Sequence, residues 1–84
     1  MATGDLQRVF GRNLREYRRV HGVSQEALAQ SLQVHRTYMG GIERGERNPT
    51  LQSVERIAER LGVEPLALLT DPQAGAVVSA TLGE

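Results

Sequence analysis

Apolar residues recur every three or four positions through most of the chain, which is the pattern of amphipathic helices. The first such stripe covers residues 5–21 and ends at Gly22, a residue type suited to the left-handed turn that closes a helix. A second helix is expected at residues 25–32, because Ser24 is a good N-cap and Leu28 and its neighbours supply an apolar face. The pattern therefore predicts two helices in the first third of the chain.

Three further short helices follow. Residues 36–43 form the third, with Gly45 closing it, although two interior glycines each cost about 1 kcal/mol relative to alanine. Thr50 is the expected N-cap of a fourth helix at residues 51–61, which Gly62 ends. Pro65 at a first helical position predicts a fifth helix to about residue 69.

These five elements, joined by short loops, predict an all-α bundle with one core formed by residues 1–70. Residues 71–84 are rich in Gly, Ala and Ser, yet the stretch 77–82 has β character. We expect this C-terminal tail either to be flexible in the monomer or to associate with a partner, a second copy included.

Length and composition narrow the class of protein. The chain has 84 residues, which suits one small domain and not a two-domain enzyme, and it has no cysteine for disulfides or thiolate zinc sites. No apolar run approaches the roughly 20 residues that span a bilayer, and no secretory leader opens the sequence. A cytoplasmic protein without a membrane partner is expected.

Charge is unevenly distributed although the formal net charge is zero. Residues 1–47 contain eight arginines and five acidic residues, whereas residues 48–84 contain two arginines and five acidic residues. A protein that binds a polyanion needs a local positive surface more than a positive total, because phosphate contacts are short-range. The N-terminal half can supply that surface, although a solvated face rich in arginine explains the same pattern.

Residues 25–44 predict two short helices that meet at a tight turn, with the small Ala29 where they cross closely. The stretch SQEALA at residues 24–29, followed by GGIERGERNPT at residues 40–50, resembles the Xre/Cro-type, lambda repressor-like helix-turn-helix family. The resemblance covers about residues 9–69 and implies a five-helix bundle that binds operator DNA by placing its third helix in the major groove.

The resemblance also implies roles for individual residues. Base readout is expected from the third helix and its N-terminal end, at His35, Arg36, Thr37, Gly40 and Gly41. Phosphate contacts are expected at Asn13, Arg15, Gln25, Arg44, Arg47 and Asn48. Arg18 and Glu43 match a structural ion pair of the family that orients the third helix.

Two departures from the family pattern lead to expectations of their own. Gln33 stands where many members have glycine, and a positive φ at a non-glycine residue costs about 1–2 kcal/mol, so a slightly wider turn is expected. Gly40 and Gly41 replace polar side chains of the third helix, so this helix is expected to sit closer to DNA and to depend more on DNA shape.

Other kinds of site have little support in the sequence. The aromatic residues are expected in the core or at its edge, and His21 and His35 are too far apart for helical metal-ligand spacing. No nucleotide-binding glycine loop and no catalytic triad is visible, so neither a cofactor nor an enzyme activity is expected.

The favoured hypothesis is a transcription regulator that binds a palindromic operator as a homodimer, with Leu66, Leu68 and Leu69 in the dimer interface. The alternative is a protein-binding module, such as an antitoxin, whose helical core binds DNA only weakly and whose C-terminal tail folds against a protein partner. The resemblance to the family also suggests a controller of a restriction-modification system, which fits the small size of the chain.

Overall fold

A computed structural model describes residues 2–71 of the chain. It contains five helices, which are α1 (Asp5–Val20), α2 (Gln25–Ser31), α3 (Arg36–Glu43), α4 (Leu51–Leu61) and α5 (Pro65–Leu68). The expected all-α fold is confirmed for this part of the chain, and the predicted helix bounds agree to within one residue. The expectations for the tail and its protein partner lie at residues 72–84, outside the described residues.

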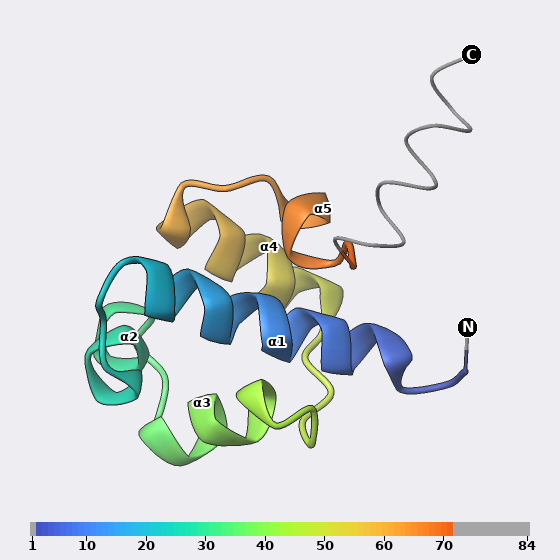
Figure 1. Ribbon diagram of the computed structural model, residues 1–84, viewed down its shortest axis with the longest axis horizontal. Coiled ribbons are helices and arrows are strands. Elements are labelled where there is room, and N and C mark those ends of the chain that lie inside the picture. Colours follow the sequence, from blue (N-terminus) through green and yellow to red (C-terminus); the bar gives the residue numbers. More distant parts are fainter. Residues whose placement is uncertain (1, 72–84) are drawn as a thin grey trace.

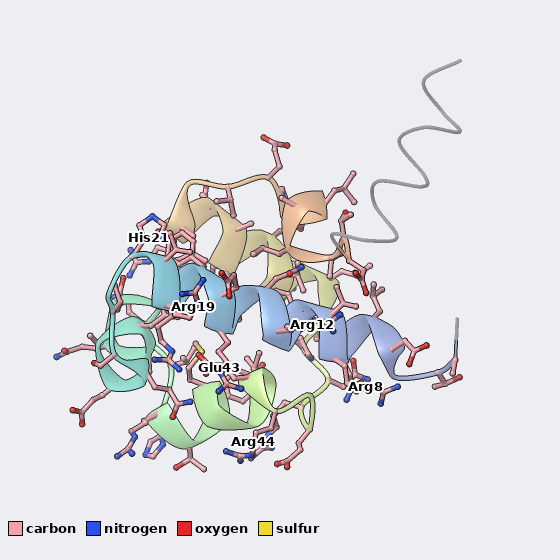
Figure 2. All side chains as sticks on the ribbon, viewed as in Figure 1. Arg8, Arg12, Arg19, His21, Glu43 and Arg44 are labelled. Carbon is pink, nitrogen blue, oxygen red and sulfur yellow. The ribbon has the colours of Figure 1, made fainter. Side chains whose placement is uncertain are left out.

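Helix α1 runs through the middle of the molecule, with α4 and α5 on one side and α2 and α3 on the other (Figure 1). The largest fully buried side chains, Phe10 and Leu14 of α1 and Met39 and Ile42 of α3, join these two helices. Exposed arginines lie along the outer surface of α1 (Figure 2). The burial of apolar side chains from all five helices therefore makes one core around α1.

Gly11 sets the distance between α1 and α3. A Cβ atom at this position would lie 2.0 Å from the carbonyl oxygen of Ile42, so any side chain would push the two helices apart. The sequence reading did not single out this residue, although an interior helical glycine that costs stability often has a packing reason. Gln7, one turn earlier, extends the contact by donating to the carbonyl oxygen of Gly45 at 2.9 Å.

The ends of α1 to α4 share one turn geometry. After α2 the amide of Val34 donates to Ala29 O at 3.0 Å and the amide of Gln33 to Gln30 O at 3.1 Å, which is the Schellman pattern. Gly22, Gly45 and Gly62 occupy the equivalent left-handed position elsewhere, and Gln33 adopts it with φ of 59°. The prediction of a wider turn is thus wrong, because the turn keeps its standard hydrogen bonds and Gln33 adopts the positive φ.

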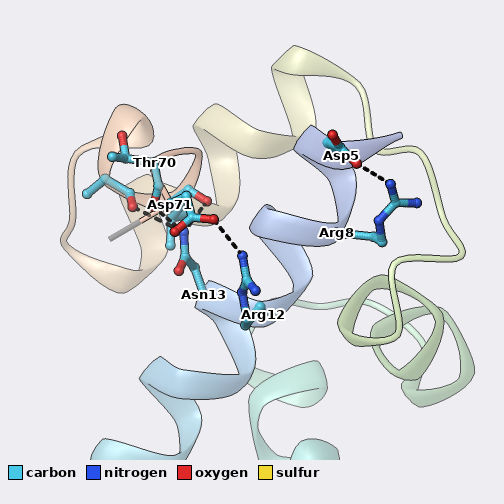
Figure 3. Close-up of polar contacts among 8 residues, drawn as sticks. Asp5, Arg8, Arg12, Asn13, Thr70 and Asp71 are labelled. Carbon is cyan, nitrogen blue, oxygen red and sulfur yellow. Dashed lines mark hydrogen bonds and ion pairs between the residues drawn. The ribbon is translucent and has the colours of Figure 1, made fainter. Parts of the chain in front are cut away.

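Asn13 attaches α5 to α1 (Figure 3). Its side-chain amide donates to the carbonyl oxygens of Leu68 at 2.8 Å and Thr70 at 3.1 Å, and the neighbouring Arg12 pairs with Asp71 at 3.0 Å. These contacts satisfy carbonyl groups at the end of a short helix that has few of its own hydrogen bonds. Asn13, expected at DNA phosphate, therefore has its amide engaged inside the fold.

The three leucines expected in a dimer interface have different environments. Leu66 is 73% exposed, whereas Leu68 is 4% exposed and belongs to the core. Leu69 is half-buried and packs against the core. Leu68 is thus a core residue of the monomer, because the short α5 packs one face on α1 and α4. None of the helices in residues 2–71 has the length and apolar character to cross a membrane.

Candidate nucleic-acid interface

Helices α2 and α3 form a helix-turn-helix whose N-terminal ends are both capped by side chains. Ser24 Oγ accepts the amide of Ala27 at 3.0 Å, and His35 Nδ1 accepts the amide of Thr37 at 3.1 Å. Acceptance at Nδ1 requires the His35 tautomer that carries its proton on Nε2. His35, predicted beside the base-reading residues, therefore has a structural role as the N-cap of α3.

A surface hollow lies between the N-terminal ends of α2 and α3. Its lining brings together six residues that the sequence analysis placed at DNA, from both helices and the loop after α3: Gln25, His35, Arg36, Thr37, Gly40 and Arg44. Arg36 and Thr37 are exposed. Helix N-termini with free amide groups favour anions, so phosphate can approach here.

A second hollow adjoins the first through Gln25 and Arg44 and is also lined by Arg15 of α1. Arg15 is exposed, and so is Arg44 at the end of α3. Arg44 pairs with Glu46 at 3.2 Å, but both side chains are about 60% exposed, a geometry that stabilises by little and leaves Arg44 accessible. Arg15 and Arg44 thus extend the cationic surface from Gln25 toward α1.

Arg18 and Glu43 form the expected ion pair between α1 and the end of α3. Arg18 Nε and Nη2 donate to the two carboxylate oxygens of Glu43 at 2.9 and 3.0 Å. The Glu43 side chain is 4% exposed, and the hydrogen bond to Glu43 raises the pKa of Arg18 above its ordinary value. A partly buried two-point pair of this kind holds α3 at one orientation against α1.

Gln25 joins the same pair. Its side-chain amide donates to Glu43 Oε1 at 3.1 Å, so the carboxylate links α1, α2 and α3. The sequence reading assigned Gln25 to phosphate and did not anticipate this bond. Gln25 thus lines the surface hollow while its side-chain amide is oriented by the hydrogen bond to Glu43.

Gly40 and Gly41 are buried rather than bare on the surface. A Cβ atom at Gly41 would lie 2.7 Å from Arg47 Cγ, and one at Gly40 would lie 3.1 Å from an Arg44 guanidinium nitrogen. Side chains from the following loop therefore cover the backbone where the sequence reading expected closer approach to DNA.

Asn48 is separated from the other predicted phosphate contacts. It lines a third hollow on the side of the molecule formed by α1 and the start of α4, together with Leu6, Phe10 and Leu51. The structure thus groups most of the predicted DNA residues around α2 and α3, and leaves Asn13 and Asn48 apart. Among residues 2–71 no group of three or more histidine and acidic side chains is placed to hold a metal ion.

Comparison with known proteins agrees with the helix-turn-helix seen in the structure. Residues 9–70 match the model of the family described as "Helix-turn-helix domain". The chain therefore belongs to the helix-turn-helix family, in its lambda repressor-like class, whose members are DNA-binding transcription regulators.

Individual relatives point in the same direction. The chain is 43% identical over 68 residues to the control protein C.BamHI of Bacillus amyloliquefaciens, covering 80% of this chain and 84% of that protein. It is similar to the solved restriction-modification controller protein C.AhdI of Aeromonas hydrophila, with 44% identity, a TM-score of 0.67 and coverage of 74% and 94%. The biofilm regulator SinR, solved in complex with DNA, matches with 32% identity, a TM-score of 0.65 and coverage of 73% and 98%.

Proposed function

We propose that this chain is a sequence-specific transcription regulator that binds a palindromic operator as a homodimer, with α3 in the major groove. The observation that carries the proposal is the exposed pair Arg36 and Thr37 at the start of α3, beside Gln25 and Arg44 in one hollow. A guanidinium can bind guanine O6 and N7 together, which discriminates against other bases by about 1–3 kcal/mol.

The charge arrangement supports this proposal. In the described part of the chain, five arginines take part in none of the ion pairs between side chains: Arg15, Arg36, Arg47, Arg56 and Arg60. The first three are predicted DNA contacts, and the last two belong to α4. Cations that no carboxylate neutralises are available to phosphate and base edges. The solved complex of the related SinR with DNA supports the same partner.

Dimerisation is part of the proposal because a single module of this size makes few base contacts. Two-fold pairing places two recognition helices about 34 Å apart on one face of the duplex. Leu66 is the best candidate for the interface, since it is apolar and 73% exposed on α5, whereas Leu68 is buried. The proposed interface therefore centres on Leu66, with Leu69 beside it.

The test of DNA recognition is selection of bound sequences from a random duplex pool by the wild type and by Arg36→Ala, at two salt concentrations. We expect a palindromic site, and loss of preference at one position of each half-site in Arg36→Ala. Arg60→Ala, which removes an exposed arginine of α4, serves as the control for lost charge and should select the wild-type site. Salt-sensitive binding with no enriched motif would contradict the proposal.

The interface is tested by sedimentation of Leu66→Arg. The variant should change from a dimer to a monomer and bind the operator more weakly, because a charge at the centre of an apolar contact is costly. Val20→Arg is the matched control, since Val20 is an apolar residue of α1 that is 64% exposed. A Leu66→Arg variant that stays dimeric would place the interface elsewhere.

A further inference from the structure

Arg47 folds back over α3 instead of extending from the loop that follows it. Its guanidinium carbon lies 5.8 Å from the centroid of the Tyr38 ring, within the range of a cation–π contact. Its aliphatic stem crosses the backbone at Gly41, where Cγ would lie 2.7 Å from an added Cβ. Tyr38 and Gly41 are three residues apart on α3 and so lie on one face of that helix.

This contact gives Gly41 a specific function. An alanine there would improve helix propensity by about 1 kcal/mol, yet its Cβ would occupy the space of the Arg47 stem. A long side chain of this kind otherwise populates many rotamers, and holding it in one place lowers the entropy lost on binding. The half-buried Tyr38 ring gives the guanidinium a defined platform on α3.

On the basis of the proposed function, we propose that Gly41 and Tyr38 are positioning residues for Arg47. Gly41 provides the space for the arginine stem and Tyr38 the platform for its guanidinium, so that a cation from the loop stands at the DNA-facing side of α3. Gly41 thus acts on DNA through Arg47, not by letting the helix backbone approach the bases. The position at which Arg47 meets DNA is defined before binding.

A double-mutant cycle on the selected operator tests this proposal. We expect Arg47→Ala to weaken binding about ten-fold and to lower the slope of log affinity against log salt by about one. Gly41→Ala should cause a similar loss in the wild-type background, since it displaces the Arg47 stem. In the Arg47→Ala background the same alanine should have no further effect, because the side chain that it displaces is gone.

Two outcomes would overturn the proposal. If Gly41→Ala leaves the operator affinity unchanged, the position of the Arg47 side chain over Gly41 has no effect on binding. If Gly41→Ala causes equal losses with and without Arg47, the added Cβ atom contacts DNA itself. Thermal unfolding of Gly41→Ala separates these results from misfolding, since its melting temperature should stay the same or rise. If the wild type selects no operator, the proposed function fails before this test begins.

The Tyr38 platform is tested in the same assay. Tyr38→Leu removes the ring and should weaken binding about three-fold, the size of an exposed cation–π contact, while Tyr38→Phe keeps the ring and should lose less. In the Arg47→Ala background, Tyr38→Leu and Tyr38→Phe should bind the operator with equal affinity. A loss for Tyr38→Leu that persists without Arg47 would assign Tyr38 a direct contact with DNA instead.

Discussion

Arg18 and Glu43 are 25 residues apart in sequence, yet the guanidinium of one and the carboxylate of the other make two parallel hydrogen bonds across α1 and α3. The pair makes two further hydrogen bonds, because Gln25 donates to Glu43 and Arg18 donates to the carbonyl oxygen of Val23. The pair therefore determines how the recognition helix lies against the rest of the bundle.

Loss of Glu43 should destabilise the fold more than loss of a surface acid. Glu43→Ala leaves Arg18 half-buried without its carboxylate, and we expect the free energy of unfolding to fall by about 2–3 kcal/mol. Glu46→Ala, which removes an exposed partner of Arg44, is the control and should cost under about 1 kcal/mol. Equal midpoints of the two variants in urea unfolding would contradict the structural role of the pair.

Glycine at position 33 should stabilise the protein. Gln33 adopts φ of 59°, and replacement by glycine removes a strain of about 1–2 kcal/mol, less the entropy gained by the unfolded chain. Gln33→Gly is therefore expected to raise the melting temperature by a few degrees. Gln30→Gly, at an exposed and regular position of α2, should lower it; a Gln33→Gly variant that behaves like Gln30→Gly would contradict the prediction.

Gly11→Ala should be destabilising although alanine favours helices. The added Cβ would lie 2.0 Å from the Ile42 carbonyl oxygen, so α1 and α3 must separate. Overpacking of this kind costs about 1–3 kcal/mol and the gain in helix propensity is about 1 kcal/mol, so we expect the free energy of unfolding to fall by up to about 2 kcal/mol. Denaturant unfolding checks this, with Gln30→Ala at an exposed position of α2 as the control expected to be neutral or stabilising. A stabilised Gly11→Ala would be inconsistent with the close crossing.

Glu16 should show a depressed titration midpoint. The hydrogen bond from Arg19, 3.1 Å between Nε and Oε1, lowers the pKa of Glu16 below its ordinary value of 4.5. Because the folded pKa is below the unfolded one, the pair stabilises the fold above about pH 4.5, and this contribution is lost as the pH falls through the folded pKa. NMR titration of the Glu16 carboxyl measures the midpoint.

Arg19→Gln is the matched variant for this titration and should return the Glu16 midpoint toward 4.5. Because both side chains are exposed, the effect on total stability should be small. A Glu16 midpoint that does not respond to Arg19→Gln would assign the shift to another group.

Much of the fold follows from local sequence. The apolar spacing, the caps at Ser24 and Thr50 and the glycines at three helix ends act within a few residues, so the five helices and their bounds were predictable from the sequence. The ion pair of Arg18 with Glu43 was also predictable, through the resemblance to the helix-turn-helix family.

Tertiary contacts decided the rest. Asn13 reaches the end of α5, Leu68 enters the core and Arg47 covers Gly41, and each of these contacts depends on how helices pack, not on residues nearby in sequence. Gly11 is the clearest case: its lack of a side chain has a meaning only because α3 crosses α1 at that point. The sequence alone determined which segments are helices and which half of the chain carries the excess of arginine, because periodicity and charge are local properties. The packing of α1 against α3 decided which predicted residues remain exposed to a partner, because burial depends on distances between segments far apart in the chain.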